Sequence, residues 1–227
     1  MKPSLPTLLS LNAGYVDTAG FLALQGLFTA HVTGNFVTFG AAAVHGTSGA
    51  LAKLLALPVF CIVVIAMRLL HYGLVRLHLP PLRAMLGLKL LLLVAGAALA
   101  IVFGPFSDGD GQWAIVTGMV LVAAMAIQNG LHRIHLADAP PSTLMTGSST
   151  QAMLDIADMI RGVPDDRRAA VRARLARLSI AILVFAVGCS AAAGCFVVLG
   201  MWCFAVPPII AAAAFAAEAS RSTLNDR

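Results

Sequence analysis

Six apolar stretches, each long enough to cross a lipid bilayer, constrain this chain more than any other feature. A transmembrane helix needs about 20 predominantly apolar residues. The composition agrees, because 59% of the 227 residues are hydrophobic and only 11% are charged, whereas soluble domains have about 25% charged residues. A single soluble core could not hide so much apolar surface. The sequence therefore predicts an all-α, polytopic membrane helix bundle with six transmembrane helices at about 7–29, 50–71, 84–104, 113–132, 178–199 and 202–219.

Two further segments have helical character but are too short or too polar to cross alone. One is 33–46, which begins Thr33-Gly34-Asn35, and the other is 144–161, which contains Thr146-Gly147-Ser148. We expect both to be re-entrant helices or half-helices that return to the side of the membrane from which they entered.

The distribution of Lys and Arg predicts the orientation. If the N-terminus is cytoplasmic and the two short segments do not cross, every Lys and Arg except Lys53 lies at a cytoplasmic end or loop. The opposite loop at 105–112 is acidic. This asymmetry follows the positive-inside rule, and it degrades if 33–46 crosses as well. The N- and C-termini are therefore both predicted to be cytoplasmic.

The net charge of +5 does not indicate nucleic acid. The basic residues sit in short loops between apolar runs, as membrane orientation signals do. The expected partners are the lipid bilayer and a small solute, with no cofactor and no metal site. A homodimer would also fit, because a six-span bundle of 23.5 kDa is small for a self-contained pathway.

The two halves of the chain echo each other. His31-Val32-Thr33-Gly34-Asn35 is matched 113 residues later by Leu144-Met145-Thr146-Gly147-Ser148, and the polar cluster 12–17 is matched by Gln128-Asn129-Gly130. Each half would hold three crossings and one short segment, so the second half would enter from the opposite side. The sequence predicts a single membrane domain, 1–227, built as an inverted-topology repeat of about 7–104 and about 113–219.

The two Thr-Gly motifs are the sharpest candidates for a binding site. Threonine is a good N-cap, and glycine permits close approach to the backbone. About ten helical residues rise about 15 Å, so two half-helices from opposite faces would meet near the midplane. Their free N–H groups would form a site for an anion, a carboxylate or a dipolar solute. The alternative is that Thr-Gly only permits tight helix–helix contact.

Asp17, with Tyr15 beside it, lies inside the first span, where an ionisable group is costly and suggests a function. Its candidate partners are Tyr15, Asn12, Gln25 or the N-terminus of a half-helix. Asp17 would bind a proton or a cation, or neutralise a basic substrate. The alternative is a structural hydrogen bond that holds the broken repeat together.

Three further polar residues belong to the candidate site. His31 precedes the first Thr-Gly motif, where it could sense pH or contact the solute. Gln128 and Asn129 lie near the end of the fourth span. They would line the site or bind a neighbouring helix.

Two carboxylates follow the second Thr-Gly motif. Asp155 and Asp158 share one face of the short helix, and we expect Arg161 or Arg133 to pair with them. Asp155 is also a candidate for a gating or proton-linked role.

A long motif in the first half carries a family resemblance. The run Leu11-Asn12-Ala13-Gly14-Tyr15-Val16-Asp17-Thr18-Ala19-Gly20-Phe21, followed by Gly26-Leu27-Phe28-Thr29-Ala30-His31-Val32-Thr33-Gly34-Asn35, resembles the signature of the YoaK family. The resemblance covers essentially the whole chain, including Met145-Thr146-Gly147, and departs from the family at Ser148, where Asn or Thr is usual. It implies a multi-pass protein of the bacterial inner membrane and implies no established activity.

These features favour a small transporter or channel for a small polar or anionic solute, with its site between the two Thr-Gly half-helices. One alternative is an intramembrane enzyme that uses Asp17 with Asp155 or Asp158 as acid and base. The sequence offers no nucleophile–base pair or phosphate loop for it, so an enzyme is the less favoured reading. A membrane accessory protein that does not transport is the other alternative.

Overall fold

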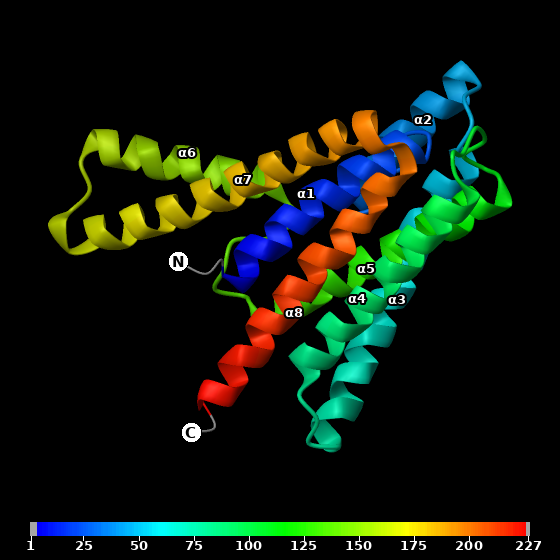
Figure 1. Cartoon of the computed structure of the whole chain (residues 1–227). Coiled ribbons are helices and arrows are strands. Elements are labelled where there is room, and N and C mark those ends of the chain that lie inside the picture. Colours follow the sequence, from blue (N-terminus) through cyan, green and yellow to red (C-terminus); the bar gives the residue numbers. More distant parts are fainter. Residues whose placement is uncertain (1–3, 226–227) are drawn as a thin grey trace.

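The computed structural model describes the backbone of residues 4–225 and the side chains of residues 4–220. Within that part of the chain it is entirely helical, which confirms the predicted all-α class. The elements are α1 (Leu5–Ala23), η1 (Val32–Gly34), α2 (Asn35–His45), α3 (Ala50–Arg76), α4 (Pro81–Phe103), α5 (Gln112–His135), α6 (Met145–Arg161), α7 (Asp165–Leu199), η2 (Gly200–Ala205) and α8 (Val206–Asn225) (Figure 1).

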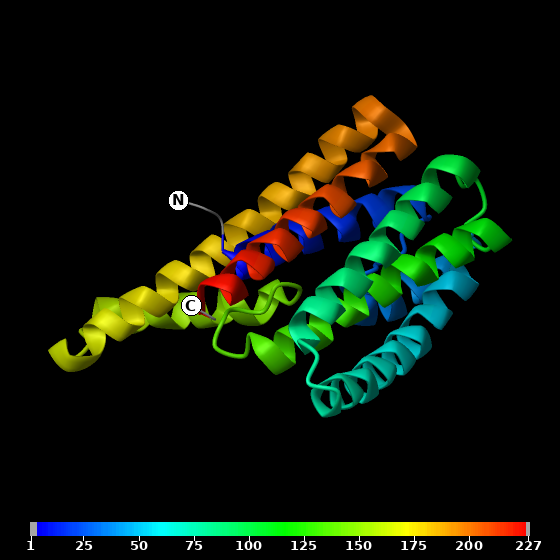
Figure 2. The same ribbon diagram turned by 60° about the horizontal axis from the view of Figure 1, so that its bottom comes forward.

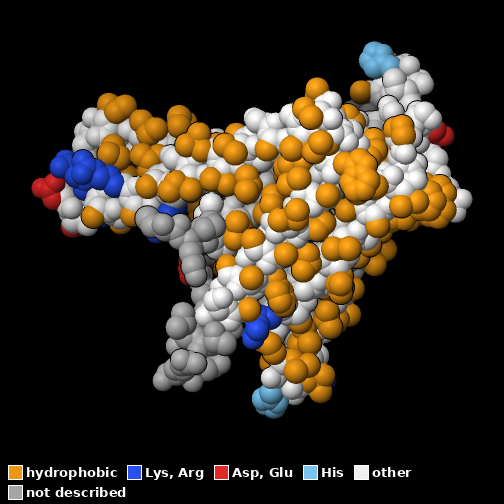
Figure 3. Space-filling model, viewed as in Figure 1, with side chains coloured by type: hydrophobic (Ala, Val, Ile, Leu, Met, Phe, Trp, Pro, Cys, Tyr) orange, Lys and Arg blue, Asp and Glu red, His pale blue; other side chains and the backbone are white. Residues whose placement is uncertain are grey.

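The surface and the lengths of the helices identify a membrane protein. Within the described residues, four helical segments are long and apolar enough to cross a bilayer. Hydrophobic side chains cover most of the face seen in Figure 3, and exposing that much apolar surface to water would be unfavourable. The four segments are Ala50–Arg76, Pro81–Phe103, Gln112–His135 and Asp165–Ser220, the last of which takes in α7, η2 and most of α8.

Local sequence explains where several helices begin and end. Ser4 is the N-cap of α1, and its Oγ accepts a hydrogen bond from the Thr7 backbone N–H at 3.4 Å. Prolines precede or open α4 and α7, where the missing N–H costs nothing. The C-cap of α2 is Gly46, whose φ of 64° is left-handed and favours glycine.

The helices form two groups (Figure 2). In one group α1 packs along α7, and α8 packs against α1. In the other group α5 packs against both α3 and α4, and the α4–α8 contact joins the groups. The short helices lie on the outside, α2 against α3 and α6 against α7.

Two glycines bring α1 and α7 unusually close together. A Cβ added at Gly14 would collide with the backbone carbonyl of Phe185, and one at Gly188 would collide with the carbonyl of Leu11. The two backbones therefore touch where these glycines cross. This is the small-residue packing expected of membrane helices.

The turns gather at two ends of the molecule (Figure 1). The two chain ends and the α3–α4 turn lie at one end, and α2 and the α4–α5 turn lie at the other. At the second end Asp110 accepts hydrogen bonds from the Gly49 and Ala52 N–H groups, both at 3.1 Å. Bonds from the Asp110 N–H and from the Ser48 hydroxyl lower the pKa of Asp108 there. Of the basic residues used to predict orientation, Lys2, Arg227 and the side chain of Arg221 lie outside the described residues.

Candidate functional site

Asp17 is buried in α1 and accepts hydrogen bonds from the loop that follows the helix. Its Oδ1 accepts from the backbone N–H groups of Thr29 at 2.8 Å, Ala30 at 2.7 Å and His31 at 3.4 Å. Charge-assisted bonds of this kind are stronger than neutral ones. Asp17 therefore fixes the position of residues 29–31, immediately before η1 and α2.

The second oxygen of Asp17 contacts an imidazole. His31 Nδ1 lies 2.7 Å from Asp17 Oδ2, and the His31 side chain is 32% exposed while that of Asp17 is 6% exposed. The contact is a hydrogen bond when His31 is neutral and an ion pair when it is protonated. His31 thus links a buried carboxylate to a more accessible position.

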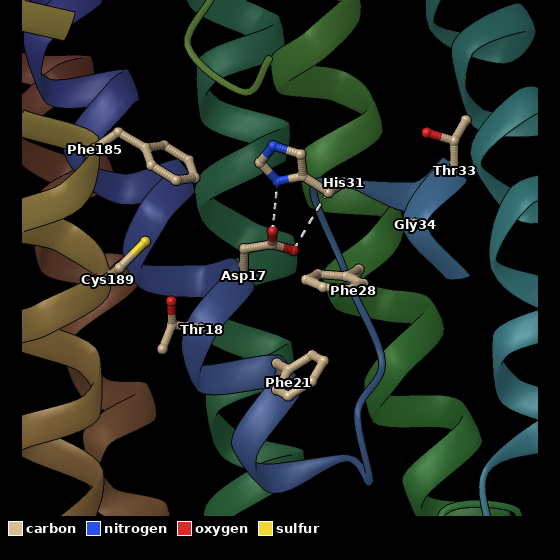
Figure 4. A pocket seen from close by; sticks show the side chains of 9 residues that line it. All are labelled: Asp17, Thr18, Phe21, Phe28, His31, Thr33, Gly34, Phe185 and Cys189. Atoms are coloured by element: carbon tan, nitrogen blue, oxygen red, sulfur yellow. Dashed lines mark hydrogen bonds and ion pairs between the residues drawn. The ribbon is translucent and has the colours of Figure 1, made fainter. Parts of the chain in front are cut away.

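The Asp17–His31 pair forms part of the wall of a cavity of about 520 Å³, which we call the Asp17 cavity (Figure 4). Phe21, Phe28 and Phe185 flank the pair, so most of the wall is apolar and aromatic. A Cβ at Gly34 would lie 3.1 Å from the Phe28 ring, so this glycine makes room for the aromatic wall. The lining residues are Asp17, Thr18, Phe21, Phe28, His31, Thr33, Gly34, Phe185 and Cys189.

The predicted partners of Asp17 are partly correct. The segment that leads into the first short helix does bind the carboxylate, as one of the alternatives stated. Tyr15 instead donates its hydroxyl hydrogen bond to the carbonyl of Cys203 at 3.0 Å, and Gln25 donates to the carbonyl of Phe106 at 3.0 Å. Asn12 donates to the carbonyl of Pro207 at 3.3 Å. These three residues join helices and turns and do not reach Asp17.

The first Thr-Gly motif lies at the Asp17 cavity, but it does not cap α2 as predicted. Thr33 is inside η1, and the N-cap of α2 is Gly34, which has no side chain to donate or accept. Asn35 holds the preceding loop instead. Its side chain accepts from the Phe28 N–H at 2.9 Å and donates to the Phe28 carbonyl at 2.8 Å.

Gln128 lies in a separate buried network on the other side of α1. Its Nε2 donates to the carbonyl of Leu9 at 2.9 Å and to the hydroxyl of Ser142 at 3.0 Å. Its Oε1 accepts a short hydrogen bond from Nζ of Lys89, whose side chain is almost completely buried. Among the described residues, Gln128 is the hydrogen-bond acceptor for this buried ammonium.

The second Thr-Gly motif also lies away from Asp17. The N-cap of α6 is Leu144, and it forms no side-chain cap, so the prediction that Thr146 caps the helix is wrong. No atom outside the neighbouring chain comes within 4 Å of a Cβ built at Gly147, and Ser148 bonds within its own helix. The loop before α6 is held by Asn129, whose Oδ1 accepts from the Thr143 hydroxyl at 2.6 Å.

Asp155 pairs with a different arginine from the two that were predicted. Arg174 of α7 donates to both carboxylate oxygens, at 2.6 and 2.9 Å, and Gln151 donates at 2.8 Å. The Arg174 bonds hold the pKa of Asp155 below its ordinary range. Asp155 therefore docks α6 onto α7 and, within the described residues, makes no contact with Asp17.

Sequence reasoning missed several residues of the site. Phe21 lies one helical turn beyond Asp17, so the i, i+4 spacing could have indicated it. Phe185 and Cys189 come from α7, which reaches the cavity only through tertiary packing. Lys89 was counted among the cytoplasmic basic residues, although its position eight residues inside an apolar helix was a signal of burial.

The fold and the buried polar groups define an α-helical membrane protein with ionisable residues enclosed between its helices. The chain belongs to the family described as "Protein of unknown function (DUF1275)", whose sequence profile matches residues 5–217. This agrees with the resemblance carried by the motif at residues 11–35. No curated protein and no solved structure matches the chain.

Proposed function

We propose that this protein is a small transporter or channel of the bacterial inner membrane and that its solute passes the Asp17 cavity. The single observation that carries the proposal is a buried carboxylate, paired with a half-buried histidine, in the wall of a cavity of about 520 Å³. Ionisable groups inside a membrane bundle are costly and generally mark ion or solute pathways.

The proposal includes six crossings with both termini in the cytoplasm. The six are α1, α3, α4, α5, α7 and α8. Helix α7 has 35 residues and so is about 52 Å long, more than the roughly 30 Å of a hydrocarbon core. Its first third carries five arginines, which would lie in or beyond the cytoplasmic headgroups.

The proposal also includes the inverted repeat, which the helix pairing supports. If α1, α2, α3 and α4 correspond to α5, α6, α7 and α8, the α1–α7 contact corresponds to α5–α3, and α2–α3 corresponds to α6–α7. The α4–α5 contact corresponds to α8–α1, and α4–α8 corresponds to itself. The main contacts of one half thus have counterparts in the other.

The Asp17 cavity favours a polar or cationic solute over an anion. The N–H groups of residues 29–31 are already neutralised by Asp17, so an anion would meet a carboxylate rather than free donors. Aromatic faces beside a carboxylate suit an organic cation or a hydrogen-bond donor. We therefore narrow the predicted solute class at this cavity to polar or positively charged molecules.

Flux through proteoliposomes tests the proposal. Wild-type protein should move at least one member of a panel of small amines and polar neutral solutes. We expect Asp17→Asn to reduce that flux about tenfold or more, since it removes the charge while keeping the shape. Asp138→Asn, at an exposed loop position, is the matched control and should behave as wild type. If no solute moves, or if Asp17→Asn transports normally, the proposed pathway is wrong and the accessory-protein alternative gains.

A further inference from the structure

The C-terminal ends of α3 and α5 carry a cluster of five basic side chains, which we call the basic cluster. The His71 and His135 rings lie 5.2 Å apart, and Arg68 is close enough to both to affect them electrostatically. Among the described residues, no carboxylate forms an ion pair with any member of the cluster. Its members are Arg68, His71, His132, Arg133 and His135.

Three nitrogens of the basic cluster are buried without a hydrogen-bond partner. They are His71 Nδ1, His132 Nδ1 and His135 Nε2. Buried polar atoms are nearly always paired, and leaving one unpaired is costly. His132 is 6% exposed, so solvent does not easily supply the partner. These atoms indicate a site built for a ligand that accepts hydrogen bonds.

A cavity of about 380 Å³ lies beside the basic cluster. Arg68 and Arg133 form its charged side, and Phe60, Val64, Met67 and Ile134 form an apolar side. An adjoining space of about 160 Å³ shares Arg133 with it and is lined by His132. A ligand that fills both features needs a negative group and a hydrocarbon part.

Two further features favour negative charge at this place. Leu144 lines both spaces and is the N-cap of α6, a helix with no side-chain cap and no acidic residue in its first turn. The partial positive charge of that helix end is therefore not neutralised. Arg68 is also held in place, because its Nε donates to the Tyr72 hydroxyl at 3.0 Å and its guanidinium lies 4.5 Å from the Tyr72 ring centre.

We propose that this cavity binds an amphipathic organic anion. Its carboxylate or phosphate lies between Arg68 and Arg133, and its hydrocarbon part lies against the apolar side. The guanidinium groups supply the fork of donors that carboxylates and phosphates fit. This goes beyond the proposed function, because the site is separate from the Asp17 cavity and binds its ligand whether or not the protein transports anything.

The test is calorimetric binding to the full chain in phosphatidylcholine nanodiscs, with empty nanodiscs as the blank. Octanoate carries both required features, octanol only the hydrocarbon, and inorganic phosphate only the charge. We expect octanoate to bind most tightly. The double variant Arg68→Gln/Arg133→Gln should weaken octanoate binding about tenfold or more, because each arginine contributes charged hydrogen bonds. Arg76→Gln, an exposed arginine on the same helix that does not line the cavity, should leave it unchanged.

A second variant keeps the test decisive if the double variant folds poorly. Leu144→Trp fills the cavity while retaining both arginines, and it should also abolish octanoate binding. Octanoate that binds more weakly in phosphatidylglycerol nanodiscs would show that an anionic lipid headgroup competes for the same site. The proposal is overturned if octanol binds as tightly as octanoate. It is equally overturned if the double variant, folded by circular dichroism, binds octanoate as wild type does.

Discussion

The two halves of the molecule hold their short helices in the same way but with different chemistry. In the first half, Asp17 near the end of α1 binds the loop at 29–31, directly before η1 and α2. In the second half, Gln128 and Asn129 near the end of α5 bind Ser142 and Thr143, directly before α6. At the 113-residue offset of the sequence echo, 29–30 corresponds to 142–143. The architecture requires a polar anchor at this position, and it does not require a charged one.

The cavities beside the two anchors differ in charge. At the same offset Asp17, Phe21 and His31 correspond to Gly130, Ile134 and Leu144, so the Asp17 cavity corresponds to the cavity beside the basic cluster. The first contains a carboxylate, whereas the second has two arginines. A repeat that conserved the shape and reversed the charge would give opposite ends of the protein different ligand preferences.

Removing the two anchors should have the largest effects, and unequal ones. Asp17→Ala leaves the N–H groups of Thr29 and Ala30 without a buried acceptor, and we expect it to cost about 3 kcal/mol or more of unfolding free energy. Asn129→Ala removes one neutral, partly buried hydrogen bond to Thr143 and should cost about 1 kcal/mol. Reversible unfolding in mixed detergent micelles would measure both.

Asp138→Asn is the control for both anchors and should not change stability. Equal losses for Asp17→Ala and Asn129→Ala would contradict the comparison, because they would mean that the carboxylate adds nothing beyond what an amide supplies.

The helix crossings offer a second, smaller contrast. At Gly14 an added Cβ would meet the backbone of α7, whereas at Gly130 it would meet the flexible end of the Met67 side chain. We expect Gly14→Ala to destabilise by about 1–3 kcal/mol, as overpacking does, and Gly130→Ala by less, because Met67 can change rotamer. Thermal unfolding of the two variants side by side would check this. A larger loss at Gly130 would show that Met67 cannot move.

The comparison also shows what the sequence could predict. Apolar length and the Pro, Ser and Gly signals predict the long helices closely, because both are local properties of the chain. The anchoring of 29–31 by Asp17 was foreseen only as one of several alternatives, since it depends on how the loop folds back 12 residues later. The predicted meeting of the two Thr-Gly motifs rested on symmetry alone. The contacts instead place Thr33 beside Asp17 and Thr146 in the first turn of a helix that packs on α7.

The pairing of Asp155 was unpredictable for a similar reason. Arg161 shares the helix of Asp155 and Arg133 precedes that helix, so both are close in sequence. Arg174 reaches Asp155 only because α7 turns back along α6 after Gly162. Lys89 shows the converse, because its burial follows from packing against α5 and not from its place beside a basic loop.

The smallest expected effect is a pH dependence that belongs to the second half alone. Arg174 lowers the pKa of Asp155, so the stabilisation of the α6–α7 contact is complete above the ordinary pKa of an aspartate, about 3.9. It is lost as the pH falls through the lowered value, because the protonated carboxyl no longer pairs with Arg174. Hydrogen exchange of the α6 amides, corrected for intrinsic rates, should therefore accelerate below about pH 4. Asp155→Asn should show fast exchange at every pH, and Asp138→Asn should match wild type. If α6 exchanges at the same corrected rate from pH 7 to pH 3, the Asp155–Arg174 pair does not hold α6 on α7.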